Sequence, residues 1–404
     1  MSFPSIEEQL KVISRGAEEI IPEDELKTRL EASSKSGTPL KIKLGCDPTR
    51  PDLHFGHAVI LRKLRQFQDL GHNAILIIGD FTGTIGDPSG QNKTRPAMTL
   101  EQARANGQSY YEQASQILDP DKTEIVYNSD WLGKLGFADV IKLAGKITVA
   151  RMLERDDFSK RYKNEEAISL HEFLYPLAQG QDSVHLKSDI ELGGTDQKFN
   201  LLVGRHLQRE NGQKQQICIT LPLLEGTDGV KKMSKSYDNY ISIEEPAQDM
   251  YGKILSIPDN LIYTYYKLLT DVDTDDLPSL KKRAEEDPRN SKHELAQTLV
   301  RQFHGETEAN AAREYFEKTV INKEIPDDLP EFEVEPGSHK IIDIIKDIGF
   351  APSKGEGKRL INQGGVTVDG AKVDDFNQEF EFSSNSSYTI KVGKRKFGKV
   401  KAGN

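Results

Sequence analysis

The sequence is poor in the residues that build disulfide scaffolds and metal centres. Its 404 residues include two cysteines, Cys46 and Cys218, which lie far apart and outside any zinc-ligand spacing. Such sparse usage is typical of a reducing compartment, so we expect a cytoplasmic protein. The longest apolar run, residues 74–78, is too short for a membrane-spanning helix. Residues 1–8 are acidic where a signal peptide would be basic and then apolar.

The charge of the chain is negative overall but unevenly distributed. A formal net charge of −10 argues against a protein that coats nucleic acid. Residues 339–404, however, contain 12 Lys and Arg against 8 Asp and Glu. The last stretch holds only basic charges, at Lys391, Lys394, Arg395, Lys396, Lys399 and Lys401. This asymmetry predicts either a local site for a polyanion or a solvated basic tail, and charge alone does not separate the two.

The pattern of apolar residues predicts the fold class. With 36% hydrophobic and 29% charged residues, the chain has the composition of a globular protein of two or three domains. Up to residue 240, short apolar strands alternate with amphipathic helices, starting with a strand at 42–45 and a helix at 57–70. This alternation predicts an α/β fold with a Rossmann-like parallel sheet. In such folds ligands bind at the carboxyl ends of the strands.

The organisation changes after residue 240. Residues 241–321 have helical periodicity without strands, and we expect an α-helical domain there. Residues 322–338 are rich in proline and acid, which predicts a linker. Residues 339–404 are patterned again and are expected to form a small α+β domain. The predicted domains are therefore 1–240, 241–321 and 339–404.

The tetrapeptide His54-Phe55-Gly56-His57 follows the first strand and opens the next helix. Helix N-termini present free N–H groups and a positive dipole end, which suit phosphates. The two imidazoles share a helical face and would add donors to a polyphosphate, while Gly56 would leave room for a base. The simpler interpretation is a helix start with two surface histidines. A zinc site is disfavoured because no third ligand is near.

The pentapeptide Lys232-Met233-Ser234-Lys235-Ser236 follows a glycine-containing turn, which suggests a mobile loop. Lysines on such a loop can contact β- and γ-phosphates as the leaving group departs, and so stabilise a transition state. The alternative is a solvated basic turn. No Walker A spacing is present, so a Walker-type NTPase is disfavoured.

Six motifs in order carry a resemblance that covers nearly the whole chain. They are residues 44–49, 54–57, 86–90, 175–182, 193–197 and 232–236. The chain resembles the class I aminoacyl-tRNA synthetases, in particular the bacterial tyrosyl branch with the full Lys-Met-Ser-Lys-Ser form. The spacing Tyr-x-x-x-Gln-x-x-Asp is the specific part, because on a helix Tyr175, Gln179 and Asp182 share one face and can line one site.

The resemblance implies roles for individual residues at the amino-acid end of the site. Asp182 would accept a hydrogen bond from the tyrosine hydroxyl. The α-ammonium group would be held by Tyr175, Gln179 and Asp87. Gln197 would orient the carboxylate of the substrate.

The resemblance also implies an ATP site. Gly45 and Asp47 would meet the adenylate, Asp196 the ribose, and Gly56 and His57 the adenosine end. Thr49 and His54 would contact the γ-phosphate in the transition state. Lys232 and Lys235, with Arg95 less certainly, would complete the pyrophosphate site. Magnesium is expected as a bridge on the phosphates rather than in a protein cage.

Three positions depart from the better-known tyrosyl branch. Lys43 stands where that branch places a tyrosine that contacts the substrate hydroxyl. Gln91 stands where a phosphate-binding lysine is common, and Gln181 replaces the commoner tyrosine before Asp182.

Residues 339–404 resemble a small RNA-binding module named after a ribosomal protein (S-four-type). Lys354, Lys358 and Arg359 would form a phosphate-binding stripe on one helix. The resemblance implies tRNA(Tyr), L-tyrosine and ATP as substrates and a homodimer as the assembly. A tryptophanyl relative, an RNA binder with an inactive catalytic domain and a small-molecule adenylate-forming ligase are the alternatives.

Overall fold

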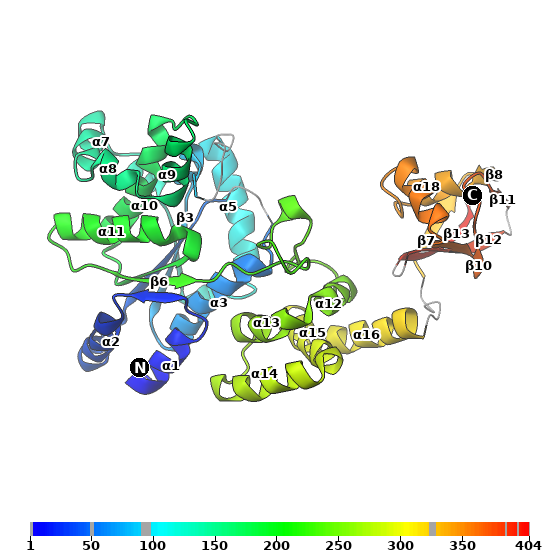
Figure 1. The fold of residues 1–404 in the computed structure, drawn as a ribbon, viewed down its shortest axis with the longest axis horizontal. Helices are drawn as coiled ribbons and strands as arrows, with labels where there is room; N and C mark the ends of the chain where they lie inside the picture. The colour runs from blue at the N-terminus through cyan, green and yellow to red at the C-terminus, as the bar shows by residue number, and fades with distance from the viewer. Residues whose placement is uncertain are drawn as a thin grey trace. The chain divides into compact units, whose positions relative to one another are not determined.

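The computed structural model describes residues 3–48, 52–89, 98–322, 329–383, 386–393 and 396–403. The chain forms two compact units, residues 1–305 and residues 306–404, which Figure 1 colours from blue to yellow and from yellow to red. The predicted site residues before position 305 belong to the first unit, and the predicted RNA-binding residues belong to the second.

The first unit is built on a six-stranded sheet with the order β1-β6-β5-β2-β3-β4. The five strands from β6 to β4 are parallel, whereas β1 pairs antiparallel with β6 at the edge. The strands are β1 (Glu19–Ile21), β2 (Lys41–Cys46), β3 (Asn73–Ile78), β4 (Thr123–Tyr127), β5 (Ile190–Gly194) and β6 (Ile217–Leu221). The predicted α/β parallel fold is confirmed, but the antiparallel edge strand β1 was not predicted.

Helices cover both faces of this sheet. Ile75 and Ile77 of β3 pack with Trp131 and with Ala178 of α10, whereas Ile78 lies against Gly107 of α5. Since side chains alternate along a strand, α10 and α5 occupy opposite faces. The helices are α1 (Ile6–Ser14), α2 (Glu23–Ser36), α3 (Phe55–Asp69), α4 (Thr82–Ile85), α5 (Leu100–Ala114), α6 (Ser129–Leu132), α7 (Phe137–Ala144), α8 (Val149–Met152), α9 (Asp156–Lys163), α10 (Leu170–Leu186) and α11 (Lys198–Glu210).

A helical layer completes the first unit. It contains α12 (Ala247–Ser256), α13 (Ile262–Leu269), α14 (Leu277–Glu286) and α15 (Pro288–His304), so the predicted helices are present from residue 247 onward. The predicted separate domain at 241–321 is not a compact unit of its own, because residues up to 305 belong to the first unit and residues from 306 to the second. Tyr265 of α13 is fully buried and donates its hydroxyl to the carbonyl of Glu225 at 2.8 Å. Its ring also meets Phe55 of α3 edge to face, so the helical layer is packed directly onto the helix that carries the first motif.

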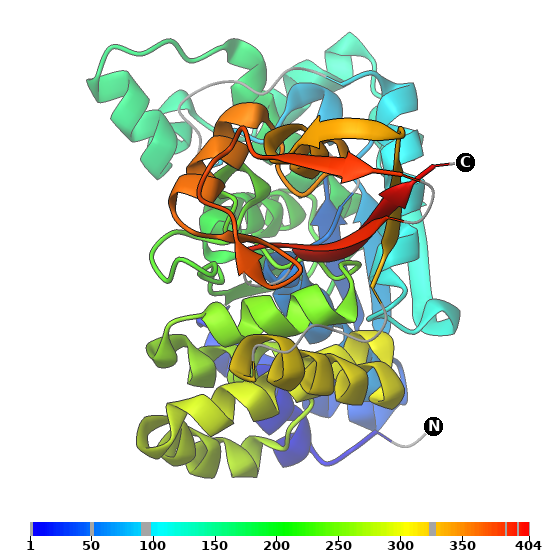
Figure 2. The same cartoon turned by 90° about the vertical axis from the view of Figure 1, so that its right-hand side faces the viewer.

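The second unit starts with α16 (Glu306–Phe316) and a π-helical turn (Glu317–Ile321) and continues into a small α+β fold. A five-stranded sheet has the order β10-β9-β12-β13-β7, and β11 pairs with β8; Figure 2 looks onto these strands, coloured orange to red. The core is apolar and includes Ile345, Val366 and Val400. The remaining elements are β7 (Glu331–Val334), β8 (Gly337–Lys340), α17 (Ile341–Asp347), α18 (Lys354–Asn362), β9 (Val366–Val368), β10 (Ala371–Lys372), β11 (Glu379–Phe382), β12 (Ser387–Val392) and β13 (Lys396–Ala402).

The predicted linker at 322–338 is wrong in its second half. β7 pairs in parallel with β13, and β8 pairs antiparallel with β11, so residues 331–338 are part of the C-terminal fold. The acidic composition indicated a linker, but Glu331 and Glu333 lie on the solvent face of an edge strand and pair with Lys401. The first half of the predicted linker falls largely on residues 323–328, which lie outside the described residues.

Candidate active site

The first motif forms the entrance of α3, as predicted. His54 is the N-cap: its Nδ1 accepts the backbone N–H of Gly56 at 3.1 Å, and Nδ1 of His57 accepts the backbone N–H of His54 at 3.3 Å. Burial lowers the pKa of His54 to about 2 and that of His57 to about 4. Both rings are therefore neutral at pH 7 and carry their proton on Nε2. Each offers one uncharged N–H donor rather than a positive charge.

Gly56 has a local structural role in addition to the one expected for it. A Cβ at this position would lie 2.8 Å from Cε1 of His54. The capping arrangement therefore requires glycine, because the imidazole of the N-cap occupies the space of any side chain.

Asp47 lies directly after β2, at the carboxyl edge of the sheet. Its Oδ2 accepts the hydroxyl of Tyr175 at 2.8 Å, and its Oδ1 accepts the hydroxyl of Thr82 at 2.6 Å. Burial, and next the nearby Asp47, raise the pKa of Tyr175 well above its usual value, so its hydroxyl stays protonated. Two predicted residues from different elements are thus brought into contact.

Asp182 is the most buried carboxylate among the predicted residues, with 2% of its surface exposed. Its Oδ1 accepts the indole N–H of Trp131 at 2.8 Å, and its Oδ2 accepts the side-chain amide of Asn128 at 3.4 Å. Burial raises the pKa of Asp182 to about 7, against the opposing charge of Lys43. Sequence reasoning missed Trp131 and Asn128, although Trp131 is the only tryptophan in the chain.

Gln179 points from α10 to the sheet. Its amide nitrogen donates to Oε1 of Glu191 at 3.1 Å, and Glu191 forms an ion pair with Lys43 at 3.0 Å. Both charged side chains are 1% exposed. The departure noted at position 43 is therefore part of a buried ion pair, and the hydrogen bond leaves the amide oxygen of Gln179 free of Glu191.

Asp87 and Gln197 meet although 110 residues separate them. The amide of Gln197 donates to Oδ2 of Asp87 at 2.8 Å, and its oxygen accepts the amide of Asn200 at 2.9 Å. Arg155, which is 5% exposed, lies 3.7 Å from Oδ1 of Asp87 and donates to Ser89 at 2.8 Å. Sequence reasoning missed Arg155 and Asn200.

The segment that follows the second motif lies beside the first motif. The backbone N–H of Phe55 donates to the carbonyl of Ile241 at 3.0 Å, and an isolated bridge joins His54 to Ser242. Nζ of Lys232 is 3.8 Å from Oδ2 of Asp196, and Lys235 pairs with Asp52.

The loop that carries the two lysines is tied down at several points. Met233 is buried and donates its backbone N–H to Leu224 at 2.7 Å, and the side chain of Asn239 accepts the backbone N–H of Ser234 at 2.8 Å. The mobility predicted for this loop stays a prediction. Thr49, Gln91 and Arg95 lie outside the described residues.

The three predicted RNA-binding residues lie on α18. Lys354 pairs with Asp343 at 2.5 Å, Lys358 lies 4.2 Å from the centre of the Phe376 ring, and Arg359 pairs with Glu356 at 2.5 Å. Lys354 and Lys358 are one helical turn apart, but Arg359 points about 140° away from Lys354 in an ideal helix. A single stripe of all three residues is therefore not formed on this helix.

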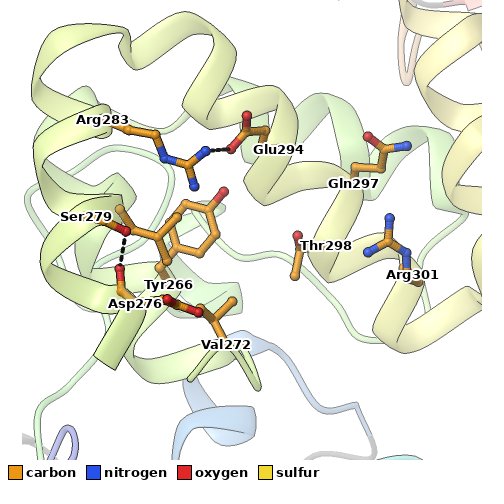
Figure 3. Close-up of a pocket in the computed structure, with 10 residues that line it drawn as sticks. Tyr266, Val272, Asp276, Ser279, Arg283, Glu294, Gln297, Thr298 and Arg301 are labelled. Atoms are coloured by element: carbon orange, nitrogen blue, oxygen red, sulfur yellow. Dashed lines mark hydrogen bonds and ion pairs between the residues drawn. The ribbon is translucent and has the colours of Figure 1, made fainter. Parts of the chain in front are cut away.

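A polar cavity of about 460 Å³ lies in the helical layer, away from all predicted site residues. Figure 3 shows its lining, with Arg283 paired to Glu294 and the Ser279 hydroxyl donating to the carbonyl of Asp276. The arginines that line it, Arg283 and Arg301, are accompanied by the acids Glu294 and Asp276. Because the lining carries both positive and negative charges, it favours neither an anionic nor a cationic ligand.

In the described ranges, no group of three His, Cys, Asp or Glu side chains could hold a metal ion. No helix in those ranges combines the length and apolar content needed to cross a bilayer.

The sheet and both motifs fall within one family. The family model for class I tRNA synthetases (W and Y) matches residues 35–320, which include every predicted residue of the amino-acid and nucleotide site. A second model, for the SYY-like C-terminal domain of tyrosine–tRNA ligase, matches residues 321–400.

Curated relatives resolve the choice between tryptophan and tyrosine. The chain is 57% identical to the tyrosine–tRNA ligase of Chlorobaculum tepidum over 99% of this chain and 98% of the relative. It is 55% identical to that of Salinibacter ruber, again over 99% and 98%. A solved structure of tyrosyl-tRNA synthetase complexed with L-tyrosine from Archaeoglobus fulgidus has a TM-score of 0.63 at 24% identity, covering 76% of this chain and 99% of that one. The chain therefore belongs to the tyrosine–tRNA ligases.

Proposed function

We propose that this chain activates tyrosine with ATP to form tyrosyl-adenylate and pyrophosphate, and then transfers tyrosine to the 3′ end of tRNA(Tyr). The single observation that supports this most is the inner face of α10. Three of its side chains reach partners on three different segments: Tyr175 reaches Asp47 after β2, Gln179 reaches Glu191 of β5, and Asp182 reaches Trp131 of α6. ATP–pyrophosphate exchange with each amino acid tests the proposal. Equal exchange with tryptophan would overturn it.

The amino-acid end of the site is assigned as follows. Asp182 accepts the phenolic hydroxyl of tyrosine. Tyr175, the amide oxygen of Gln179 and Asp87 hold the α-ammonium group, and Gln197 orients the carboxylate. The hydrogen bond between Gln197 and Asp87 supports this assignment. It holds the residue assigned to the carboxylate of tyrosine beside a residue assigned to its α-ammonium group, and these two groups are adjacent in the amino acid.

The nucleotide end uses backbone and uncharged donors. Gly45 and Asp47 lie against the adenylate, Gly56 and His57 support the adenosine, and Asp196 binds the ribose. Thr49 and the Nε2–H of His54 contact the γ-phosphate, while Lys232 and Lys235 leave Asp196 and Asp52 for the pyrophosphate. The substrate carboxylate itself attacks the α-phosphate, so positioning and electrostatics carry catalysis without a general base.

Magnesium would be held mainly by the phosphates of ATP. Its preference for oxygen ligands and retained water fits a site with few dedicated protein carboxylates. Bound there, it would neutralise charge that develops on pyrophosphate.

The second unit would supply contacts to tRNA. Lys354, Lys358 and Arg359 are exposed cations. The acids paired with Lys354 and Arg359 can be exchanged for phosphate oxygens at little cost, because exposed ion pairs are weak. We also assign this enzyme to the cytoplasm, in keeping with its two unpaired cysteines.

Removing the C-terminal domain is expected to separate the two half-reactions. The cut belongs after Asn322 rather than after Ser338, because Ser338 lies inside β8. The shortened chain should keep tyrosine-dependent exchange close to the full rate and should charge tRNA poorly. Raising salt should weaken charging by the intact chain in the same direction, as expected for phosphate contacts. Charging at the intact rate by the shortened chain would show that the domain does not bind tRNA.

A homodimer is proposed from an apolar surface on the first unit. Phe137 and Ile141 of α7 are 82% and 57% exposed, Val149 of α8 is 64% exposed, and Leu170 at the start of α10 is 81% exposed. Large exposed apolar side chains in neighbouring elements usually mark an interaction surface.

Phe137→Asp should therefore convert a dimer into a monomer in sedimentation velocity. Tyr162→Asp changes another exposed aromatic residue, on α9, and serves as a comparison. A Phe137→Asp protein that sediments as the wild type does would place the interface elsewhere.

A further inference from the structure

Lys43 and Glu191 form a buried charge pair directly beneath α10. They are Cα partners in the parallel register of β2 and β5, and their side chains meet at 3.0 Å. Burying two charges costs several kcal/mol for each ion before any compensation, so such a pair is weak support for stability by itself. Its position therefore calls for a role in the site.

The pair lies against α10, the helix that carries Tyr175, Gln179 and Asp182. Nζ of Lys43 donates to the carbonyl of Gln179 at 3.3 Å, and Glu191 accepts the amide of Gln179 and the hydroxyl of Ser183. Side chains alternate along β2, so Lys43 shares a face with Gly45, and that face continues toward Asp47. The charge pair thus lies between the sheet and the helix that carries Asp182.

The positive charge of Lys43 opposes the effect of burial on the pKa of Asp182. Burial raises its pKa to about 7, and the positive charge of Lys43 is the largest influence that lowers it, followed by the hydrogen bonds from Trp131 and Asn128. Glu191 acts in the opposite direction. A protonated Asp182 would be a donor itself and would no longer be a carboxylate acceptor for a phenol.

We propose that Lys43 is a specificity-determining residue of the tyrosine site, because it supplies the buried positive charge against which Asp182 accepts the hydroxyl of the substrate. This inference rests on the proposed role of Asp182. The lysine acts through Asp182 and not by contact with the substrate.

The surroundings of Asp182 limit which groups can control its ionisation. Lys43 comes from β2 and Glu191 from β5, whereas α6 and α4 contribute neutral polar groups. The groups to be considered are Lys43, Glu191, Tyr175, Asn128, Trp131, Thr82 and His185, the last of which stacks on Trp131.

The test combines a titration with a specificity measurement. Trp131 is the only tryptophan and donates its indole N–H to Asp182, so its single indole ¹⁵N–¹H resonance reports the protonation of that carboxylate. In the wild type this resonance should titrate near neutral pH. In Lys43→Met the titration should move to higher pH by at least one unit, a shift on the scale that a lost neighbouring charge produces. Lys43→Met/Glu191→Gln removes both charges and should titrate in between.

Kinetics should follow the titration. The kcat/KM for tyrosine in exchange should fall about tenfold or more at pH 7 in Lys43→Met and recover at higher pH, while the KM for ATP changes less than about twofold. The preference for tyrosine over phenylalanine should decline at pH 7. Lys41→Met, in the same strand but exposed, is the matched control and should behave as the wild type.

The outcomes separate this inference from the function it rests on. An indole titration that is the same in wild type, Lys43→Met and the double variant overturns the role of Lys43. A titration that moves without any change in tyrosine kinetics shows instead that Asp182 does not accept the substrate. If Lys43→Met fails to fold, the double variant, which leaves no unpaired buried charge, decides between these outcomes.

Discussion

Lys235→Ala is expected to slow ATP–pyrophosphate exchange by about 10²-fold or more, the usual effect of removing a charge that acts on the transition state. The binding of tyrosine without ATP, followed by equilibrium dialysis, should barely change. The reason lies in the resting contacts of the lysine. It pairs with Asp52 at the entrance of the first motif, far along the chain from the residues that surround Asp182.

Lys231→Ala provides the control for this experiment. Lys231 precedes the motif in the same loop, is exposed, and its ammonium lies over the ring of Tyr237. Its loss should leave exchange within about twofold of the wild type. A collapse of tyrosine affinity in Lys235→Ala would mean that the lysine maintains the structure of the resting site instead of acting on pyrophosphate.

The wild-type protein is expected to prefer tyrosine over phenylalanine by about 10⁴ to 10⁵ in exchange, which is the magnitude already established for tyrosine-activating enzymes as a class. Phenylalanine would leave the buried carboxylate of Asp182 without the partner that the substrate supplies. Asp182→Asn keeps the volume of the side chain but removes the charge. It should lower kcat/KM for tyrosine by roughly 10²-fold, because hydrogen bonds to charged groups are the stronger ones.

Phenylalanine should be used equally poorly by Asp182→Asn and by the wild type, so the loss should fall on tyrosine alone. Asp130→Asn changes an exposed carboxylate next to Trp131 and should leave both substrates unaffected. If the exchange activity with both amino acids fell in parallel in Asp182→Asn, Asp182 would stabilise the structure of α6 and α10 rather than recognise the hydroxyl of tyrosine.

The sequence predicted the fold well where one local pattern decided the outcome. The parallel strands and the start of α3 follow from apolar periodicity and helix-start signals. β1 was not predicted because its three residues are too few to show the apolar periodicity of a strand. β7 was missed because an edge strand can present acids to solvent and still pair through its backbone.

The sequence indicated the residues that we propose for the site, but not the side chains that contact them. Tyr175, Gln179 and Asp182 could be found because their spacing on one helix is visible in the sequence. Their partners come from distant segments: Trp131 and Asn128 from α6 and its cap, Glu191 from β5, and Arg155 from the start of α9. Only the folded chain brings these groups to the same carboxylates and amides. The neutrality of His54 and His57 was equally hidden, since it follows from burial and mutual capping.

Because these two histidines are neutral, the binding of ATP and the binding of tyrosine should respond differently to acid. Burial lowers the pKa of His54 to about 2 and that of His57 to about 4, so both imidazoles should stay uncharged when the interior of a cell acidifies. Burial raises the pKa of Asp182, which we propose accepts the hydroxyl of tyrosine, to about 7. Acidification should therefore lower the affinity for tyrosine before it lowers the affinity for ATP. ATP would then stay bound without a substrate carboxylate to attack its α-phosphate, and charging would stop without consuming nucleotide.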